Sequence, residues 1–259
     1  MSKTILLVHG AWVTTGCWSG FRDFFEAQGY QVVAPPWPYM DRPVEALRST
    51  PDPRIAALTI NDLVDHFEKH IRALPEAPIV IGHSFGGLIV QMLLDRGLGA
   101  AGVAIDAGPP RGVLPSPRAI QSALPVLLAW RGWARILSMS FEGFSTTFAN
   151  TLSPSQQRET YADHIVPAPG RIYFQAALGI GNAVNFKNLK RPPLLLTAAA
   201  EDRTSTPSMV REMYRRHYQA SSQTDIVEFP KRSHWLIAEP GWEEVAGAIL
   251  KWLVANANG

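Results

Sequence analysis

The stretch Ile79-Val80-Ile81-Gly82-His83-Ser84-Phe85-Gly86-Gly87-Leu88-Ile89-Val90 sets one serine among three glycines, between two apolar runs. The β-branched residues before it favour a strand, and the apolar run after it favours a helix. Glycine is unfavourable inside either element, so three glycines around one serine indicate a constraint on the backbone. A strand, Gly-x-Ser-x-Gly and a helix together are typical of a tight turn that exposes a nucleophilic serine. We therefore predict a positive φ angle at Ser84 and no room for side chains at 82 and 86.

A serine hydroxyl is a weak nucleophile unless a base accepts its proton and an acid orients that base. With this kind of turn the expected chain order is serine, then an acid, then histidine. Asp202 follows the apolar segment 194–197, and His234 follows the segment that ends at Phe229. Both lie just past a predicted strand, at the edge of the sheet where α/β proteins form their sites. We predict that Ser84 is the nucleophile, His234 the base and Asp202 the acid.

Two other carboxylates compete for the role of the acid. Glu201 is next to Asp202, but the side chains of adjacent residues generally diverge. Asp106 ends the strand that follows the serine turn, so it also lies near the site. We prefer Asp202 and interpret Asp106 as a buried carboxylate bonded to backbone N–H groups.

Acyl transfer also needs hydrogen-bond donors for the developing oxyanion. The first expected donor is the backbone N–H of Phe85, directly after the nucleophile. The second should come from a loop after an early strand, and Val8-His9-Gly10-Ala11-Trp12 is such a loop. Gly10 allows a close approach of the backbone. We predict that the N–H of Ala11 is the second donor, with that of Trp12 as the alternative.

Short apolar runs alternate with helical patterns along most of the chain. The runs read as buried strands, at 4–8, 31–34, 79–81, 103–105, 194–197 and 226–229. Helical patterns cover 21–28, the segment after Thr59, 88–96 and 242–254. This alternation predicts an α/β fold with a mainly parallel sheet. Residues 109–191 show no convincing strand but many aromatic residues, which predicts a helical insertion between two strands.

The sequence resembles the α/β-hydrolase fold superfamily, and within it the serine esterases that carry a helical cap. The residues that carry the likeness are His9-Gly10-Ala11-Trp12, Gly82-His83-Ser84-Phe85-Gly86-Gly87, Asp202 and Ser233-His234-Trp235. The resemblance implies a core domain of residues 1–108 and 192–259, with residues 109–191 as the cap. It also implies ester hydrolysis without a metal or an organic cofactor.

Differences from neighbouring families narrow this implication. Haloalkane dehalogenases and epoxide hydrolases of this fold carry aspartate where this chain has Ser84. Plant hydroxynitrile lyases carry lysine directly after the catalytic histidine, where this chain has Trp235. Two other kinds of function stay open: a small-molecule receptor that keeps the triad with little turnover, and a cofactor-free lyase or C–C bond hydrolase.

The expected substrate is a small to medium, mostly apolar carboxylic ester. Cap side chains should form an apolar pocket with Trp12 and Trp235, because binding pockets are mostly apolar with a few fixed polar groups. Four cap arginines are expected on the outer face, since an unpaired buried guanidinium is unfavourable. They are Arg111, Arg118, Arg131 and Arg135.

The composition argues against several other classes. The chain has 259 residues, of which 46% are hydrophobic and 18% charged, with a formal net charge of +2. This balance fits a folded globular protein and gives no sign of a nucleic-acid partner. The single cysteine, Cys17, fits a reducing compartment, and no stretch is long enough to span a membrane. We expect a soluble cytoplasmic protein, monomeric or homodimeric, without a membrane partner.

The remaining histidines are weaker candidates. His66 and His70 share one helix face, where a solvated surface is commoner than a metal site. His164 and His217 lie in polar stretches and are expected at the surface. His83 adjoins the nucleophile and is expected to pack under the turn.

Overall fold

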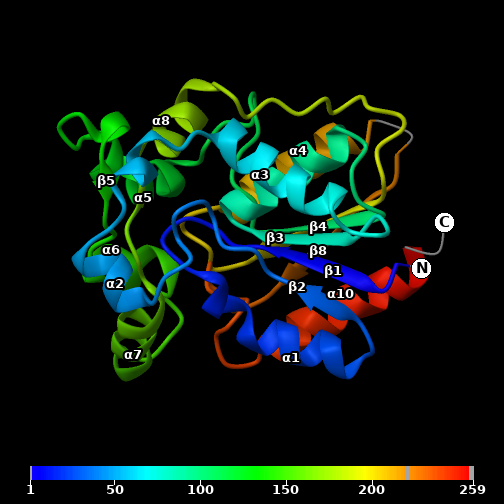
Figure 1. Cartoon of the computed structure of the whole chain (residues 1–259), viewed down its shortest axis with the longest axis horizontal. Coiled ribbons are helices and arrows are strands. Elements are labelled where there is room, and N and C mark those ends of the chain that lie inside the picture. Colours follow the sequence, from blue (N-terminus) through cyan, green and yellow to red (C-terminus); the bar gives the residue numbers. More distant parts are fainter. Residues whose placement is uncertain (1, 220–221, 257–259) are drawn as a thin grey trace.

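The computed structural model describes residues 2–219 and 222–256. Its centre is a parallel six-stranded sheet with the strand order β2-β1-β3-β4-β7-β8 (Figure 1). The strands are β1 (Thr4–Val8), β2 (Gln31–Val33), β3 (Ile79–His83), β4 (Ala101–Ile105), β7 (Leu194–Ala199) and β8 (Thr224–Phe229). All six predicted strands are present: β1 has the predicted ends, and each of the others shifts by one or two residues at one end. The fold is therefore the α/β-hydrolase fold that the sequence predicts.

Helices cover both faces of this sheet, which explains why the strands are apolar throughout. Every residue of β1, β3, β4 and β7 is buried. Helices α1 (Ser19–Ala27) and α10 (Trp242–Asn256) lie on one face, and α3 (Ile60–Arg72) and α4 (Phe85–Asp95) on the other (Figure 1). Helix α9 (Pro207–His217) contacts β7 and β8. Among the described residues, none of the helices has the length and apolar composition needed to cross a bilayer.

Local sequence signals fix the helix ends. Thr59 caps α3 through a reciprocal pair of hydrogen bonds with Asp62: its hydroxyl accepts the Asp62 N–H, and the Asp62 carboxylate accepts the Thr59 N–H. Gly29 follows α1 with a φ of 81°, a conformation that glycine adopts without strain.

Most of the regular structure between β4 and β7 is helical. Its elements are α5 (Pro117–Leu127), η3 (Gly132–Ala134), α6 (Phe141–Gly143), the π-helical turn η4 (Phe144–Phe148), α7 (Pro154–His164) and α8 (Arg171–Leu178). Contrary to the prediction it also holds two strands, β5 (Ile136–Leu137) and β6 (Ala168–Pro169), which pair in an antiparallel manner. Each has only two residues, too few for a strand pattern to show in the sequence.

Candidate active site

Ser84 occupies the strained turn between β3 and α4. Its φ of 57° and ψ of −121° confirm the predicted positive φ. Side chains at Gly82 and Gly86 have no room: a Cβ at Gly82 would overlap the backbone of Gly86, and one at Gly86 the carbonyl of Val8. The Ser84 N–H donates to Ile105 O at 2.9 Å, so the end of β4 also holds this turn. The backbone thus fixes where the hydroxyl projects.

Asp202 and His234 form a buried pair, each on a loop after a neighbouring strand. His234 Nδ1 donates to Asp202 Oδ2 at 2.6 Å, and neither side chain is accessible to solvent. Asp202 Oδ1 accepts the backbone N–H groups of Thr204 and Ser205, at 2.6 and 2.8 Å. Burial opposes the charge of Asp202, but the His234 ring and these hydrogen bonds outweigh burial and keep its pKa below the usual value. The geometry supports Asp202 as the group that orients His234.

Asp106 lies close to this pair, with ligand atoms of the three side chains within 4.8 Å of one another. Its Oδ1 accepts the Ala199 N–H at 3.0 Å, whereas its Oδ2 is buried without a hydrogen-bond donor from the described residues. Two carboxylates can share a hydrogen bond only when one keeps its proton. Burial, followed by the charge of Asp202, raises the pKa of Asp106 well above its usual value. We interpret Asp106 as the protonated partner, which donates to Asp202.

His83 connects the serine turn to the loop that carries His234. Its Nε2–H donates to the carbonyl of His234 at 2.7 Å, and the two rings lie 4.6 Å apart. Burial and the neighbouring His234 hold the pKa of His83 well below its usual value, so the ring is neutral. His83 therefore does more than pack under the turn, because it fixes the backbone of the base.

Glu239 anchors the same loop, a role that no pattern in the sequence indicates. Its carboxylate is 3% exposed and accepts the hydroxyl of Ser233 at 2.7 Å and that of Thr151 at 2.6 Å. It also accepts the Ser233 N–H at 3.2 Å. Ser233 precedes the base, so these bonds fix the backbone directly before His234.

The predicted hydrogen bond between His234 and the Ser84 hydroxyl is not formed in this structure. His234 Nε2 is buried and has no hydrogen-bond partner among the described residues, so it does not bond the Ser84 hydroxyl here. Such bonds are often long in ligand-free sites and tighten when a substrate binds. The structure thus brings Asp202 and His234 together and places Ser84 beside His83, which bonds His234.

The loop after β1 passes directly against the serine turn. A Cβ on Gly10 would lie 2.8 Å from the Cβ of Ser84, so this backbone approaches as closely as glycine allows. His9 is buried, and burial lowers its pKa to about 4, so the ring is neutral. It bonds the carbonyl of Gly10 through Nδ1 and accepts the Trp37 N–H at Nε2. The N–H of Ala11 therefore lies on a loop held at the nucleophile.

Phe85, which carries the other predicted donor, is the first residue of α4. The N–H groups in the first turn of a helix have no acceptor within that helix. The partial positive charge of a helix N-terminus also favours a developing oxyanion. Both features make the Phe85 N–H suitable for the role predicted from the sequence.

A cavity of about 510 Å³ opens over Ser84. Trp12 lines it as predicted, and so does Tyr173 of α8, which the sequence did not single out from the other aromatic residues. Tyr173 packs on the rings of Trp12 and Phe85, with centroids 5.4 and 5.0 Å away. It thus bridges the two segments that carry the predicted oxyanion donors.

Trp235 is not part of this cavity wall, which corrects the prediction from the sequence. It is 1% exposed and packs against Phe148 and His164, with ring centroids 5.9 and 5.2 Å away. The turn after β8 that aims the His234 ring at Asp202 sends the next side chain into the interior. A second correction concerns His217, which is fully buried and bonds Gln91 rather than lying at the surface.

Only one group of three ligand-type side chains converges in the described part of the chain. It consists of Asp106, Asp202 and His234, whose ligand atoms lie within 4.8 Å of one another. Their mutual hydrogen bonds and those from the backbone already occupy most of these atoms. The arrangement therefore fits proton handling at a histidine better than the binding of a cation.

Comparisons with known proteins agree with this architecture. Solved structures that resemble the chain include a monoacylglycerol lipase from Paleococcus ferrophilus, with 21% identity and a TM-score of 0.71 over 98% of this chain and 96% of that one. A pyrethroid hydrolase from Sphingobium faniae JZ-2 has 20% identity and a TM-score of 0.72 over the whole of both chains. Polyneuridine aldehyde esterase has 14% identity and a TM-score of 0.69 over 97% and 99%. A search of curated proteins gave no match. The model of the alpha/beta hydrolase family matches residues 5–248, and the chain belongs to that family.

Proposed function

We propose that the protein is a serine hydrolase that cleaves a small to medium, mostly apolar carboxylic ester through an acyl-enzyme on Ser84. The observation that carries this proposal is the position of Ser84: at a φ of 57° on a glycine-bounded turn, in the wall of a cavity, and directly after His83, which bonds the histidine of a hydrogen-bonded Asp–His pair. A strained serine in such a place has little use in a purely structural turn.

Each residue of the site has a role in the proposed reaction. The Ser84 hydroxyl attacks the ester carbonyl carbon while His234 Nε2 takes its proton. The N–H groups of Ala11 and Phe85 stabilise the oxyanion. His234 then protonates the leaving alkoxide, and a water molecule activated by the same nitrogen cleaves the acyl-enzyme. Asp202 stays ionised and stabilises the imidazolium that forms at each step.

Residues 109–191 are proposed as the cap that selects the substrate, with 1–108 and 192–259 as the core. Helices α5 and α8 of this segment supply much of the cavity wall, and much of their contribution is apolar. None of the four cap arginines lines the cavity, and Glu142 is its one charged lining residue. This supports an uncharged substrate without a carboxylate.

A panel of chromogenic esters with graded acyl length tests the proposal, with Ser84→Ala as the control. Each buried methylene contributes about 0.8 kcal/mol, so kcat/KM should rise a few-fold per added carbon until the cavity is full. An organophosphonate should add one adduct, on Ser84. An adduct elsewhere, or near-normal turnover of Ser84→Ala, would contradict the assignment. One stoichiometric reaction without further turnover would instead identify a receptor.

The choice of acid has its own test. Asp202→Asn should lower kcat by orders of magnitude, because an amide at this position favours the wrong tautomer of His234. A larger loss in Asp106→Asn than in Asp202→Asn would reverse the assignment of the two carboxylates.

A further inference from the structure

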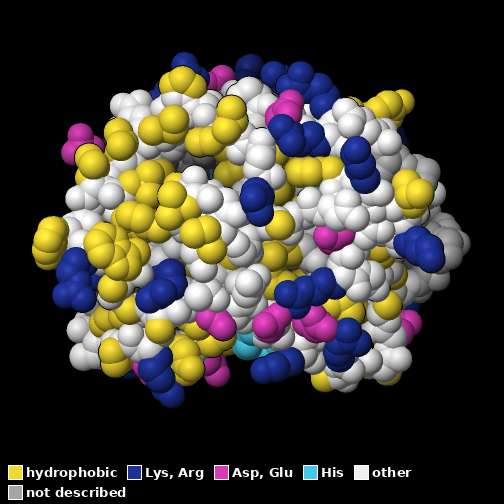
Figure 2. Space-filling view, turned by 90° about the horizontal axis from the view of Figure 1, so that it is seen from above, with side chains coloured by type: hydrophobic (Ala, Val, Ile, Leu, Met, Phe, Trp, Pro, Cys, Tyr) yellow, Lys and Arg dark blue, Asp and Glu magenta, His cyan; other side chains and the backbone are white. Residues whose placement is uncertain are grey.

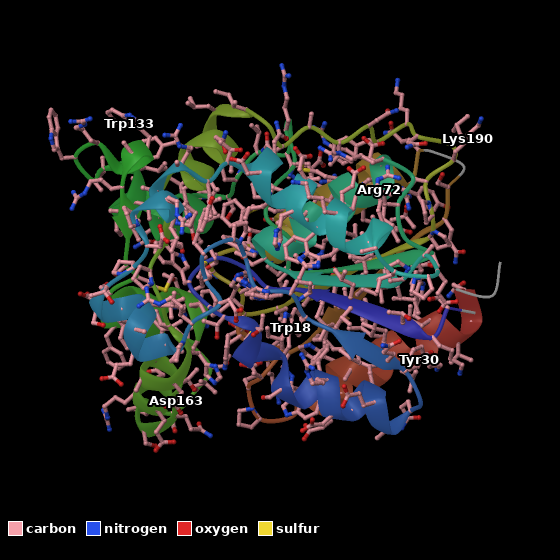
Figure 3. The ribbon with its side chains drawn as sticks, viewed as in Figure 1. Trp18, Tyr30, Arg72, Trp133, Asp163 and Lys190 are labelled. Carbon is pink, nitrogen blue, oxygen red and sulfur yellow. The ribbon has the colours of Figure 1, made fainter. Side chains whose placement is uncertain are left out.

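The end of α5 and the turn after it expose large apolar side chains to an unusual degree. We call residues 124–135 the cap tip. Within it Leu128 is 78% exposed, Trp130 79% and Trp133 50%. Of the eight tryptophans in the chain, these two are the ones that the structure shows as exposed. Figure 3 places Trp133 at the outer edge of the molecule, at the end opposite Lys190.

The backbone holds the cap tip in this arrangement. Gly132 is buried, and a Cβ there would lie 2.8 Å from the carbonyl oxygen of Val126. Its N–H donates to Ala129 O at 2.9 Å, and Arg131 takes a φ of 51° to make the turn. Trp133 packs edge-on against Phe174 of α8. The fold thus presents Trp130 outward on a well-packed turn rather than on a loose loop.

The charged residues near the cap tip in the sequence are all positive. Residues 107–141 contain no aspartate or glutamate and four arginines. Arg131 and Arg135 belong to the cap tip itself, and both are exposed. Figure 2 shows apolar side chains gathered over the half of the molecule that contains the cap segment, with basic side chains at its margin.

The cap tip is continuous with the proposed substrate cavity. Ala123, Val126 and Leu127 of α5 line the cavity, whereas Leu124 and Leu128 of the same segment face solvent. The helix therefore carries apolar side chains both toward the cavity and toward the outside. An apolar ester at the cap tip would lie one helix thickness from the cavity.

We propose that the cap tip docks on an anionic lipid surface and that the substrate ester enters the cavity from that surface. Tryptophan beside arginine is the combination that favours the boundary between water and lipid. Anionic headgroups would supply negative charges to pair with these arginines, since this segment contains no acidic residue. A second copy of the chain fits less well, because a symmetric contact would bring the same arginines together without an acid. This proposal departs from the expectation of no membrane partner; that expectation rested on the absence of a membrane-spanning stretch, and docking needs none.

Vesicle binding tests this proposal without any catalysis. The protein used is Ser84→Ala, so that the lipids stay intact, with vesicles of phosphatidylcholine that contain or lack phosphatidylglycerol. Co-sedimentation should occur with the anionic vesicles and fall about tenfold or more in Trp130→Ser. Replacement of Arg131 and Arg135 by Gln should weaken it by about 25-fold, roughly fivefold for each charge. The controls Tyr218→Ser and Lys251→Gln, at exposed positions outside the cap, should bind like the parent.

Turnover separates this proposal from the proposed function on which its substrate clause rests. With Ser84 present, the cap-tip variants should lose activity on a long-chain ester dissolved in vesicles and keep it on a short water-soluble ester. If the cap-tip variants lost activity on both esters, their effect would not be on docking. If the parent enzyme cleaved neither ester, only the esterase assignment would be contradicted. Docking is also overturned if anionic vesicles are not bound, or if light scattering shows a dimer that Trp130→Ser dissolves.

Discussion

Replacement of Asp106 by Asn should change how stability depends on pH. In the folded protein the pKa of Asp106 is raised by burial and by the charge of Asp202, whereas in the unfolded chain it lies near 3.9. Above that pH the unfolded carboxyl is ionised while the folded one keeps its proton. Stability from this group is therefore fully present below about pH 4 and is lost as the pH rises toward the raised pKa.

The slope of the unfolding free energy against pH follows from the one proton that Asp106 keeps in the folded state. Between the two pKa values the wild type loses about 1.4 kcal/mol of unfolding free energy per pH unit through Asp106, and Asp106→Asn loses none. For a chain of this size that corresponds to about 3 °C in Tm per pH unit. For each pH unit between the two pKa values the variant should therefore gain about 1.4 kcal/mol relative to the wild type. Asp202 adds no slope in this range, because its lowered pKa leaves it ionised in both proteins.

Thermal unfolding followed by circular dichroism at pH 5, 6 and 7 measures this difference, and groups common to both proteins cancel. Parallel curves would mean that Asp106 carries a charge, which would refute the protonated interpretation. Activity gives a second readout. Asn can accept the Ala199 N–H and donate to Asp202, and it tolerates a φ of 42°, so Asp106→Asn should keep kcat/KM within a few-fold. Asp106→Ala removes both bonds and should lower kcat/KM by tenfold or more.

Three further results are expected. Gly10→Ala should lower kcat more than tenfold and destabilise the fold by about 1–3 kcal/mol in urea unfolding, because its Cβ would lie 2.8 Å from the Cβ of Ser84. The control Gly247→Ala, in a helix with open space around the new methyl group, should stabilise the fold by about 1 kcal/mol. Trp12→Ala should raise KM for long-chain esters, while Trp235→Ala should act chiefly on Tm, because the first side chain lines the cavity and the second lies in the core. A neutral ester should have a higher kcat/KM than its carboxylate-bearing analogue, because Glu142 is the charged group in the wall; preference for the anion would mean that an arginine turns inward.

The parts of the molecule that follow from local patterns were predictable. Buried strands, the capped start at Thr59 and the positive φ at Ser84 each depend on residues within a few positions of one another. The grouping of the serine, the acid and the histidine was also predictable, because each follows a parallel strand and such strands bring their carboxyl ends to one edge of the sheet. Such signals are local or topological, and neither needs knowledge of side-chain packing.

Side-chain directions inside the site were not predictable. Trp235 follows the base directly, yet the turn that aims the histidine sends this ring into the core. Glu239 binds Ser233 and Thr151, and the contact with Thr151 joins positions 88 residues apart in the sequence. Hydropathy also does not distinguish Trp130, which faces solvent, from Trp12, which faces a cavity. The difference depends on which helices pack above each ring.

The roles of the two carboxylates depend on how many donors reach each one. Asp202 receives two backbone N–H groups and the His234 ring, whereas Asp106 receives the one N–H of Ala199. Because two adjacent buried carboxyls cannot both ionise without a large cost, the charge stays on the carboxyl with more donors. The proton then stays on the other, where it supplies Asp202 with one more donor. The backbone after β7, which turns two N–H groups toward Asp202, thus decides which of two similar residues holds the histidine.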